Sequence, residues 1–233
     1  MNQNLIHPNH IAIIPDGNRR WAIDHKLPTI EGHRRGYENV VRIMEYLRKL
    51  EISTVTFWAF SVDNWQRSKD EVKHLMRIFE LFIDKHLKEA IKNEVKLIHI
   101  GRRDRLPESL KNKIKAAEEK TKNFSHFFFN IALDYSGRDE IVRAVNKVSS
   151  MKYQVSSMTE DDINNNLDLA GQPYPEPDII IRTGKQIRLS GFMLWQSQYS
   201  ELFFPNKYFP DFREADIDMI LDEYRIRQRR FGK

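Results

Sequence analysis

Three segments of the sequence place charged and polar side chains directly after apolar runs. The first, residues 11–21, ends in Asp16, Gly17, Asn18, Arg19, Arg20 and Trp21. Strand ends are where α/β proteins hold ligands. A glycine there lets backbone N–H groups approach an anion, and the two arginines could bind phosphate oxygens. Asp16 could then hold Mg²⁺ against that phosphate. The alternative interpretation is an ordinary Asp-Gly turn with solvated arginines.

The second segment, residues 57–67, is an apolar run that leads into polar residues. These residues are Ser61, Asp63, Asn64, Trp65 and Arg67. The alternative is the start of a helix, since Ser68 followed by Glu71 matches a capping box. Both interpretations can hold, because Ser68 can cap the helix while residues 61–67 remain free to bind.

The third segment, residues 181–192, carries Arg182, Arg188 and Ser190, and Glu201 follows it. Two arginines six residues apart with a serine could form a second anion pocket. The Gly-Lys pair inside this segment is not a nucleotide-binding P-loop, because Gln186 stands where that motif requires Ser or Thr. Each of the two anion-binding groups therefore has one acid beside it, Asp16 or Glu201.

Several other chemistries lose support. The chain has no cysteine, which excludes disulfides, thiolate zinc sites and a cysteine nucleophile. The dinucleotide fingerprint and the zinc-protease motif are both absent, and the eight histidines lack zinc-ligand spacing. For His7 and His10 we expect local packing. The net charge of +5 is a mild excess, spread along the chain.

The apolar runs predict an α/β fold. Strand-like runs cover residues 10–14, 53–60, 95–101, 126–133 and 178–182, with a weaker one at 200–204. Apolar residues at helical spacing predict helices over 36–50, 70–91, 107–121, 137–148 and 214–230. Because the runs are continuous and the intervals suit helical crossovers, we expect a parallel sheet buried on both faces. Residues 152–177 read as a loop.

The length of 233 residues suits one domain covering residues 1–233. No apolar run approaches the roughly 20 residues of a membrane-spanning helix, and residues 1–10 lack the apolar core of a signal peptide. A cytosolic location is therefore the expectation. Together, the three segments predict a site that holds two anionic groups beside a large apolar surface.

The same three segments, DGNRRW, FSVDNWQR and RTGKQIRLSGF followed by WQSQYSEL, resemble the signature blocks of the cis-prenyltransferases, the undecaprenyl diphosphate synthase family. The resemblance runs from His7 to Gly232. It implies a six-stranded, mainly parallel sheet with an apolar tunnel for a growing prenyl tail. It also implies a cytoplasmic homodimer, at most transient membrane contact, and no nucleic acid partner.

The activity that the resemblance implies is a Mg²⁺-dependent transfer of a prenyl group in isoprenoid biosynthesis. Isopentenyl diphosphate would be condensed with an allylic prenyl diphosphate to give a (Z)-prenyl or polyprenyl diphosphate. Asp16 and Glu201 would bind the metal. Ser61 and Asn64 would act with Asp16 at the reacting groups.

The resemblance also implies substrate contacts. The allylic diphosphate would lie against Gly17, Asn18, Arg19, Arg20, Trp21 and His33. Isopentenyl diphosphate would bind Arg182, Arg188 and Ser190, and Trp65 and Arg67 would position the reacting groups. Arg230 and Gly232 resemble the C-terminal Arg-x-Gly that completes the isopentenyl site of the partner subunit.

Some positions depart from the family pattern. Pro15 and Arg19 stand where Met and Gly are usual, and Thr29 stands where Arg is frequent. Lys185, Gln186, Ile187 and Gly191 replace a Gly-Glu-x run and a later Asn. The PDGNRR and LSGF variants are similar to those of enzymes that couple two allylic units irregularly, such as lavandulyl diphosphate synthases. Irregular coupling is therefore an alternative function.

Two further alternatives are a non-catalytic partner subunit and a groove for single-stranded nucleic acid. Retention of Asp16 with Arg182 and Arg188 argues against the first, and the small charge excess argues against the second. Residues 127–129 are three consecutive phenylalanines, where some relatives carry smaller residues. They predict a shorter product than the long bacterial lipid carrier, unless they only pack the core.

Overall fold

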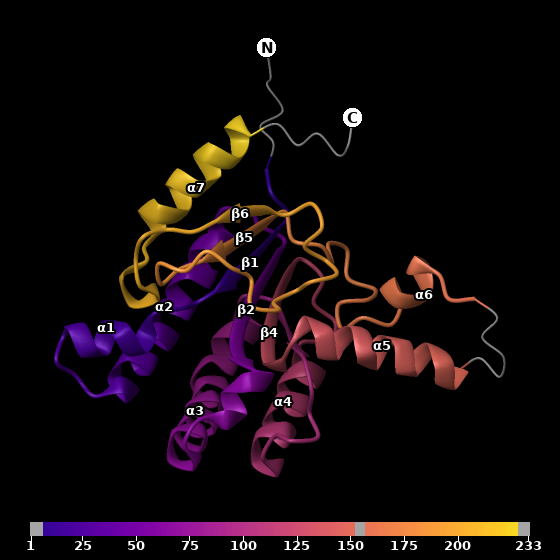
Figure 1. The fold of residues 1–233 in the computed structure, drawn as a ribbon, viewed down its shortest axis with the longest axis horizontal. Coiled ribbons are helices and arrows are strands. Elements are labelled where there is room, and N and C mark those ends of the chain that lie inside the picture. The colour runs from indigo at the N-terminus through magenta and orange to yellow at the C-terminus, as the bar shows by residue number, and fades with distance from the viewer. Residues whose placement is uncertain (1–6, 152–156, 228–233) are drawn as a thin grey trace.

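A computed structural model describes residues 7–151 and 157–227 of the chain. At its centre lies a sheet of six strands in the order β3-β4-β2-β1-β5-β6 (Figure 1). The strands are β1 (His10–Ile14), β2 (Thr54–Ser61), β3 (Val95–Ile100), β4 (Phe127–Tyr135), β5 (Ile179–Arg182) and β6 (Glu201–Phe203). Every neighbouring pair is parallel. The predicted α/β class and all six predicted strands are confirmed, and the sheet is wholly parallel.

The central strand β1 shows why the strands read as continuous apolar runs. Successive side chains along a strand point to opposite faces of the sheet. Ile11 and Ile13 belong to the hydrophobic cluster on one face, whereas Ala12 and Ile14 belong to the cluster on the other. Because both faces are covered, every position of the strand is buried.

The helices predicted from periodicity are present. They are α2 (Thr29–Lys49), α3 (Lys69–Lys92), α4 (Glu108–Thr121), α5 (Gly137–Met151) and α7 (Glu214–Ile226). The predicted helix over 214–230 ends at residue 226, and residues 228–230 lie outside the described part of the chain. The structure adds α1 (Asn18–Asp24) and α6 (Glu160–Asn164), the latter within the predicted loop, together with the 3-10 helices η1 (Val62–Gln66) and η2 (Phe209–Asp211). These pieces are too short for a helical period to be read.

Helix α2 begins seven residues before its predicted start. Its first two turns contain only one large apolar residue, Ile30, so they carry no apolar stripe. Arg34 forms ion pairs with Glu31 and Glu38 at three- and four-residue spacing, and Arg35 pairs with Glu31 as well. Such pairs favour helix on an exposed surface. The extension carries His33 toward the end of β1, where the first segment lies.

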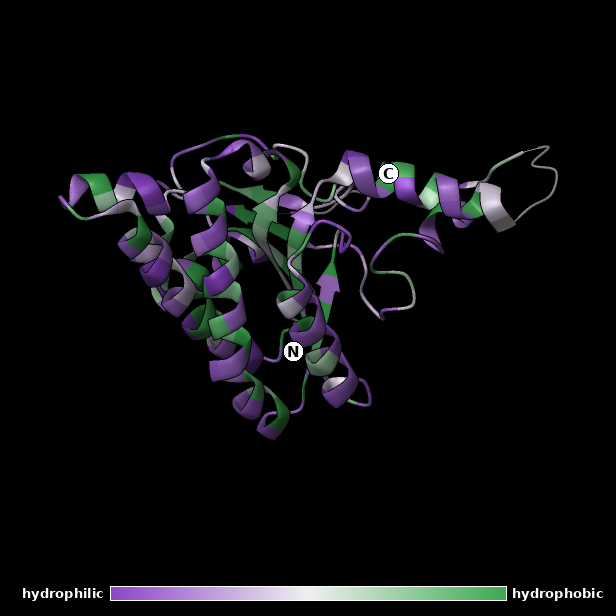
Figure 2. Ribbon diagram, turned by 90° about the horizontal axis from the view of Figure 1, so that it is seen from below, coloured by the Kyte–Doolittle hydropathy of each residue, from purple (hydrophilic) through white to green (hydrophobic). Residues whose placement is uncertain are grey.

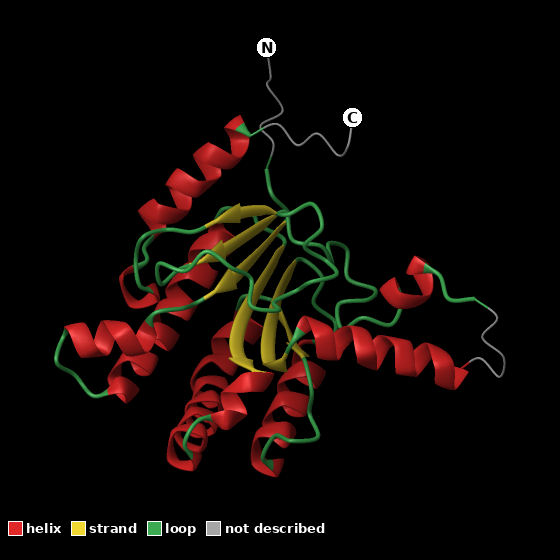
Figure 3. Cartoon of the chain, viewed as in Figure 1, coloured by secondary structure: helices red, strands yellow, loops and turns green. Residues whose placement is uncertain are grey.

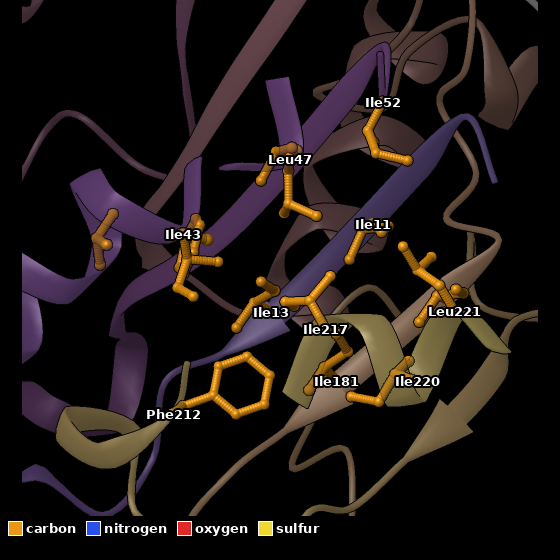
Figure 4. Packing of buried hydrophobic residues seen from close by; sticks show 14 of the residues in the cluster. Ile11, Ile13, Ile43, Leu47, Ile52, Ile181, Phe212, Ile217, Ile220 and Leu221 are labelled. Carbon is orange, nitrogen blue, oxygen red and sulfur yellow. The ribbon is translucent and has the colours of Figure 1, made fainter. Parts of the chain in front are cut away.

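One face of the sheet is covered by helices. Ile43 and Leu47 of α2 and Ile217 and Leu221 of α7 pack around Ile11 of β1 and its neighbours (Figure 4). Helices α3 and α4 lie side by side beyond the ends of β2 and β4 (Figure 1). They form a second cluster with Phe60 and Leu133 of these strands. An apolar layer therefore continues from the core toward the carboxyl ends of the strands.

The other face is covered mainly by chain outside the helices, with Leu169, Leu189, Phe192 and Met193 packed on it, rather than by a helix layer. Phe192 stacks on Trp58 of β2 with a ring-centroid separation of 5.1 Å. Helix α5 extends away from the sheet together with α6, and long loops cross the sheet beside them (Figure 3). In Figure 2, hydrophobic residues concentrate on the strands and on the helix sides that face them. Within the described ranges, no helix combines the length and apolar character needed to span a bilayer.

Two buried histidines lie between strands. His10 Nε2 and Thr56 Oγ1 are 2.7 Å apart, and His99 Nε2 lies 3.0 Å from the carbonyl oxygen of Leu133. Burial lowers the pKa of each imidazole to about 4, below the ordinary 6.5. Both rings are therefore neutral at pH 7, and the expected packing role of His10 is confirmed.

These lowered pKa values predict a loss of stability in mild acid. Between pH 6.5 and 4 the unfolded chain binds protons that the folded chain does not, so stability falls as pH falls. At pH 5 each histidine should cost about 2 kcal/mol relative to pH 7. Urea unfolding of His10→Gln should lose about that share of the pH dependence. The exposed His7→Gln variant is the control, and equal pH dependence in the two variants would contradict the assignment.

Candidate active site

Adjacent strands β1 and β5 end in opposite charges. Ile14 of β1 is in register with Arg182 of β5, and Asp16 follows two residues later. Arg182 Nη2 donates to Asp16 Oδ2 at 2.9 Å, and Arg20 Nη2 of α1 donates to Asp16 Oδ1 at 3.1 Å. The first and third segments of the sequence therefore meet at one carboxylate.

The place where they meet is a switch point of the sheet. The chain leaves β1 for β2 on one side, and β5 lies on the other side of β1. In open parallel sheets this arrangement opens a crevice beyond the strand ends, and ligands bind there. The Asp16–Arg182 pair spans that crevice.

Glycines close the turns around the pair. Gly17 precedes α1 with φ of 104°, a conformation that favours glycine. Gly184 has φ of 82°, and a β-carbon there would lie 2.8 Å from the carbonyl carbon of Asp16 and from Arg20 Nη2. Thr183 Oγ1 donates to the carbonyl oxygen of Asp16 at 2.8 Å. The backbone after β5 thus packs directly on the backbone after β1.

Helices α1 and α2 approach as closely as glycine allows. A β-carbon at Gly32 would lie 2.0 Å from the Asn18 carbonyl oxygen, and one at Gly36 would lie 2.6 Å from Asn18 Oδ1. His33 lies between these glycines and is 8% exposed. Burial, and then the neighbouring Arg67, lower the pKa of His33 to about 4, so the ring is neutral at pH 7. Its buried Nε2 has no hydrogen-bond partner among the described residues.

The second segment forms a compact turn after β2. Ser61 N–H donates to Asn64 Oδ1 at 3.1 Å, and the two side chains form a capping box around η1. Ser68 also caps α3 by accepting from Glu71 N–H at 3.3 Å. The functional and capping interpretations of this segment are therefore compatible.

Trp65 makes its hydrogen bond outside this turn. Its indole Nε1 donates to Asp134 Oδ1 at 2.8 Å. Asp134 is fully buried and also accepts from Arg105 Nε at 2.9 Å, and the Arg105 guanidinium lies over the Trp65 ring. These contacts anchor Trp65 and the turn that carries it, and its role in substrate binding stays a prediction.

Arg182 organises the third segment. Its Nη1 donates to Ser190 Oγ at 2.7 Å and to the Arg188 carbonyl oxygen at 2.6 Å. The Arg188 side chain is exposed and donates to Gln186 Oε1 at 2.5 Å. Because the Gln186 amide carries no charge, the charge of Arg188 is not neutralised by this contact.

A cavity of about 670 Å³ begins at these residues and continues between the sheet and α2, α3 and α4. One end is polar and charged. The other end is apolar, lined by Leu75, Phe79, Phe82 and Ile83 of α3, Leu110, Ile114 and Ala117 of α4, and Phe57, Phe60, Leu97, Phe129, Ile131 and Leu133 of the sheet. Such a site suits a molecule with an anionic head and a hydrocarbon tail.

The structure brings most of the predicted site residues to this cavity. Those lining it are Asp16, Gly17, Asn18, Arg19, Arg20, His33, Ser61, Asn64, Arg67, Arg182 and Ser190. Trp21, Trp65 and Arg188 are not among its lining residues. Trp21 instead packs on η2, where its Nε1 donates to Asp211 Oδ1 at 2.9 Å. Arg230 and Gly232 lie outside the described residues.

Glu201 is not among the residues that line the cavity. It begins β6 in register with Ile179, at the amino end of β5, whereas Arg182 is at the carboxyl end. Three strand residues separate these ends by about 10 Å. Glu201 Oε2 accepts from Arg227 Nη1 at 2.8 Å. The structure therefore does not join Glu201 to Asp16 within one chain, and its role as a metal ligand stays a prediction.

The donor set suits a metal that the substrate helps to hold. In the described ranges no three His, Asp or Glu side chains group as a cation site. Asp16 is partly exposed at the polar end of the cavity, so its carboxylate can reach a bound ion. Mg²⁺ is often bound by one or two carboxylates together with substrate phosphates. Asp16 fits that arrangement.

Some contributing residues were not found from the sequence. Arg20 and Lys185 both lie over the ring of Tyr208. The ring centroid is 5.5 Å from Arg20 Cζ and 5.1 Å from Lys185 Nζ. Glu71 lies within 3.8 Å of three basic side chains at the polar end of the cavity. Glu71 was read only as part of a helix cap, and nothing local in the sequence marks Tyr208. Both act through contacts between distant segments.

Comparison with known proteins identifies the family. The family model described as putative undecaprenyl diphosphate synthase matches residues 14–232. The chain belongs to this family. It is 42% identical to an isoprenyl transferase of Aquifex aeolicus, with 97% of this chain and 96% of that protein covered. It is 41% identical to a tritrans,polycis-undecaprenyl-diphosphate synthase (geranylgeranyl-diphosphate specific) of Pyrococcus horikoshii, over 97% of this chain and 87% of that protein.

Solved structures agree with this assignment. Lavandulyl diphosphate synthase from Lavandula x intermedia, in complex with dimethylallyl diphosphate, superposes with a TM-score of 0.93 at 38% identity, covering 97% of this chain and 98% of that one. A probable undecaprenyl diphosphate synthase from Campylobacter jejuni gives 0.82 at 34% identity, covering 98% and 100%. The suspected family is confirmed, and the chain is a prenyltransferase.

The tight packing of Gly184 on Asp16 gives a test of the site. Gly184→Ala forces a β-carbon against the Asp16 backbone and should lower prenyl transfer by at least about tenfold, since small misplacements at a reacting centre have large effects. Gly171 is the matched control: its φ is 80°, but a β-carbon there meets nothing within 4 Å. Gly171→Ala should share the backbone strain and keep its activity. Equal activity of the two variants would contradict the proposed packing role.

Proposed function

We propose that the protein condenses isopentenyl diphosphate with an allylic prenyl diphosphate to give a (Z)-prenyl or polyprenyl diphosphate, with Mg²⁺ as cofactor and one catalytic domain covering the chain. The observation that carries the proposal is the cavity whose charged end contains the Asp16–Arg182 pair and whose other end is apolar. Diphosphate heads and hydrocarbon tails match these two ends. Family membership supports the same reaction class.

The charged end would stabilise the leaving group. In the reaction a new carbon–carbon bond forms, the allylic carbon–oxygen bond breaks, and a proton leaves the isopentenyl unit. Negative charge grows on the departing diphosphate, so Arg20 and the N–H groups near Gly17 should stabilise it. Mg²⁺, held by Asp16, would neutralise part of the same charge. Removal of one such donor typically costs about 3 to 4 kcal/mol.

The second head group would be held beside the first. Arg182 is 5% exposed and fixed by Ser190, so its position is set before substrate binds. Isopentenyl diphosphate bound to Arg182 and Ser190 would lie next to an allylic diphosphate bound near Arg20 and His33. Ser61 and Asn64 line the same cavity and could orient the reacting carbons. Holding both reactants in one cleft would raise the rate by making their reaction effectively unimolecular.

The apolar end would bind the tail. Each added isoprene buries about four or five CH₂ equivalents, or roughly 3 to 4 kcal/mol at 0.8 kcal/mol per CH₂. The walls of this end come from the α3 stripe and from β4. Of the three consecutive phenylalanines, only Phe129 lines the cavity. Its ring also packs edge-on against Phe57 at 5.8 Å, so it is both a core residue and a wall.

Irregular coupling of two allylic diphosphates is a second candidate function. The TM-score of 0.93 to a lavandulyl diphosphate synthase favours it, as do Pro15, Arg19 and Gly191, which depart from the family pattern. Dimethylallyl diphosphate supplied alone separates the candidates. Irregular coupling should give a ten-carbon diphosphate from dimethylallyl diphosphate alone. Regular elongation should give no product until isopentenyl diphosphate is added.

The carboxylate of Asp16 gives the most direct test of the charged end. Asp16→Ala should lower turnover by at least about a hundredfold, since it removes the group assigned to Mg²⁺. Asp16→Asn keeps the shape and should lose activity similarly. Turnover is measured with labelled isopentenyl diphosphate and geranyl or farnesyl diphosphate, and circular dichroism checks the fold. Near-normal turnover in a folded variant would contradict the metal role.

The size of Phe129 gives a test of the apolar end. Phe129→Ala should lengthen the product by at least one isoprene unit, because it enlarges the cavity where the tail ends. Chromatography of dephosphorylated products measures this. Phe128→Ala is the control, since Phe128 is on the same strand but does not line the cavity. Unchanged product length in Phe129→Ala would leave core packing as its sole role.

Three further expectations from the resemblance stay predictions. They are the homodimer, the cytoplasmic location, and the completion of the isopentenyl site by Arg230 and Gly232 of a partner. Size-exclusion chromatography with light scattering tests the homodimer.

A further inference from the structure

Glu71 is an acid in the middle of basic groups at the charged end of the cavity. Its Oε1 lies 3.1 Å from Arg67 Nη1, 3.8 Å from Arg19 Nη1 and 3.8 Å from His33 Nε2. These groups come from three elements: Arg19 from α1, His33 from α2 and Arg67 from the end of η1. One carboxylate oxygen thus faces two guanidinium groups and one neutral imidazole from three separate parts of the chain.

The contacts satisfy the basic groups only in part. Arg67 makes a hydrogen bond to Glu71, but 3.8 Å is too long for hydrogen bonds to Arg19 and His33. His33 Nε2 is buried and has no hydrogen-bond partner among the described residues. A diphosphate has more oxygens than a carboxylate and could reach all three groups at once. The arrangement is therefore incomplete without a larger anion.

Glu71 also weakens the cavity for such an anion. Arg19, His33 and Arg67 all line the cavity, so a negative ligand there would lie close to Glu71. The Glu71 side chain is 21% exposed, and charges that are partly buried are screened less than charges in water. The carboxylate therefore both holds the basic groups together and repels the anion that they attract.

We propose that Glu71 is an internal counter-anion that lies against Arg19, Arg67 and the neutral imidazole of His33 in the free enzyme and competes for these three side chains with the diphosphate of substrate or product. Entry of a diphosphate takes Arg19 and His33 away from Glu71, and its departure returns them. Such competition limits the affinity for the diphosphate that the reaction releases and so favours turnover. This inference rests on the proposed function.

A different role for Glu71 would have the opposite sign. If the carboxylate only oriented Arg67 and Arg19 for the ligand, its removal would weaken anion binding. If it competes with the ligand, its removal should strengthen binding. The sign of the change in affinity therefore decides between orientation and competition.

Isothermal titration of the folded full-length chain with inorganic pyrophosphate is the test. Glu71→Gln should bind about tenfold more tightly than the wild type. Glu71→Asp, which keeps the charge, should stay within about threefold of the wild type. Glu89→Gln, an exposed acid on the same helix, is the control for net charge and should change little.

The outcomes separate cleanly. Equal or weaker binding by Glu71→Gln, equal tightening by Glu89→Gln, or no binding by any of these chains would overturn the inference. In the steady state, Glu71→Gln should lower KM for the allylic diphosphate without raising kcat. Failure of the proposed function would appear differently, as absence of prenyl product from the wild-type chain while pyrophosphate binding keeps its dependence on Glu71.

Discussion

The ion pair between Asp16 and Arg182 joins the ends of two adjacent parallel strands, and the rest of the site depends on it. The strands fix the two backbones in register, and glycines on both sides let the following turns touch. Arg20 then completes the contact from α1. Both strands are buried on two faces, so Arg182 is held within the core, and Asp16 follows two residues after the end of a buried strand. A charged cluster fixed in this way needs little structural rearrangement when an anion binds, so the free energy cost of reorganisation is small.

The apolar end of the cavity follows from the same sheet. Helices α3 and α4 pack beyond the ends of β2 and β4, so the hydrophobic layer continues directly from the charged cluster. Phe129 belongs to the main core and also lines the cavity, so under the proposed function the packing of this residue would affect product length. Glu71 adds a second coupling, because one α3 residue contacts basic groups on the elements around the mouth. Under the inference drawn above, the Glu71 carboxylate limits the affinity for the diphosphate and so favours its release.

Much of this arrangement could be predicted from the sequence, and what could not has a physical cause. Buried parallel strands appear as continuous apolar runs, so β1 and β5 and the residues after them were located correctly. The short helix α1 and the charged start of α2 carry no period to read. The hydrogen bond from the Trp65 indole to Asp134 could not be predicted, because the buried acid lies far along the chain, and the substrate-binding role of Trp65 stays a prediction. Because β6 runs parallel to β5, its first residue Glu201 lies at the amino ends of the strands, away from Asp16 of the same chain, and its metal-binding role stays a prediction.

A crystal structure of the protein with a non-reactive thio analogue of farnesyl diphosphate and Mg²⁺ would test the central claim most directly. The account predicts the diphosphate between Asp16, Arg20 and His33, with the hydrocarbon chain directed toward Phe129. A head group bound away from the β1 end, or a tail lying on the outer surface while the cavity stays empty, would contradict it.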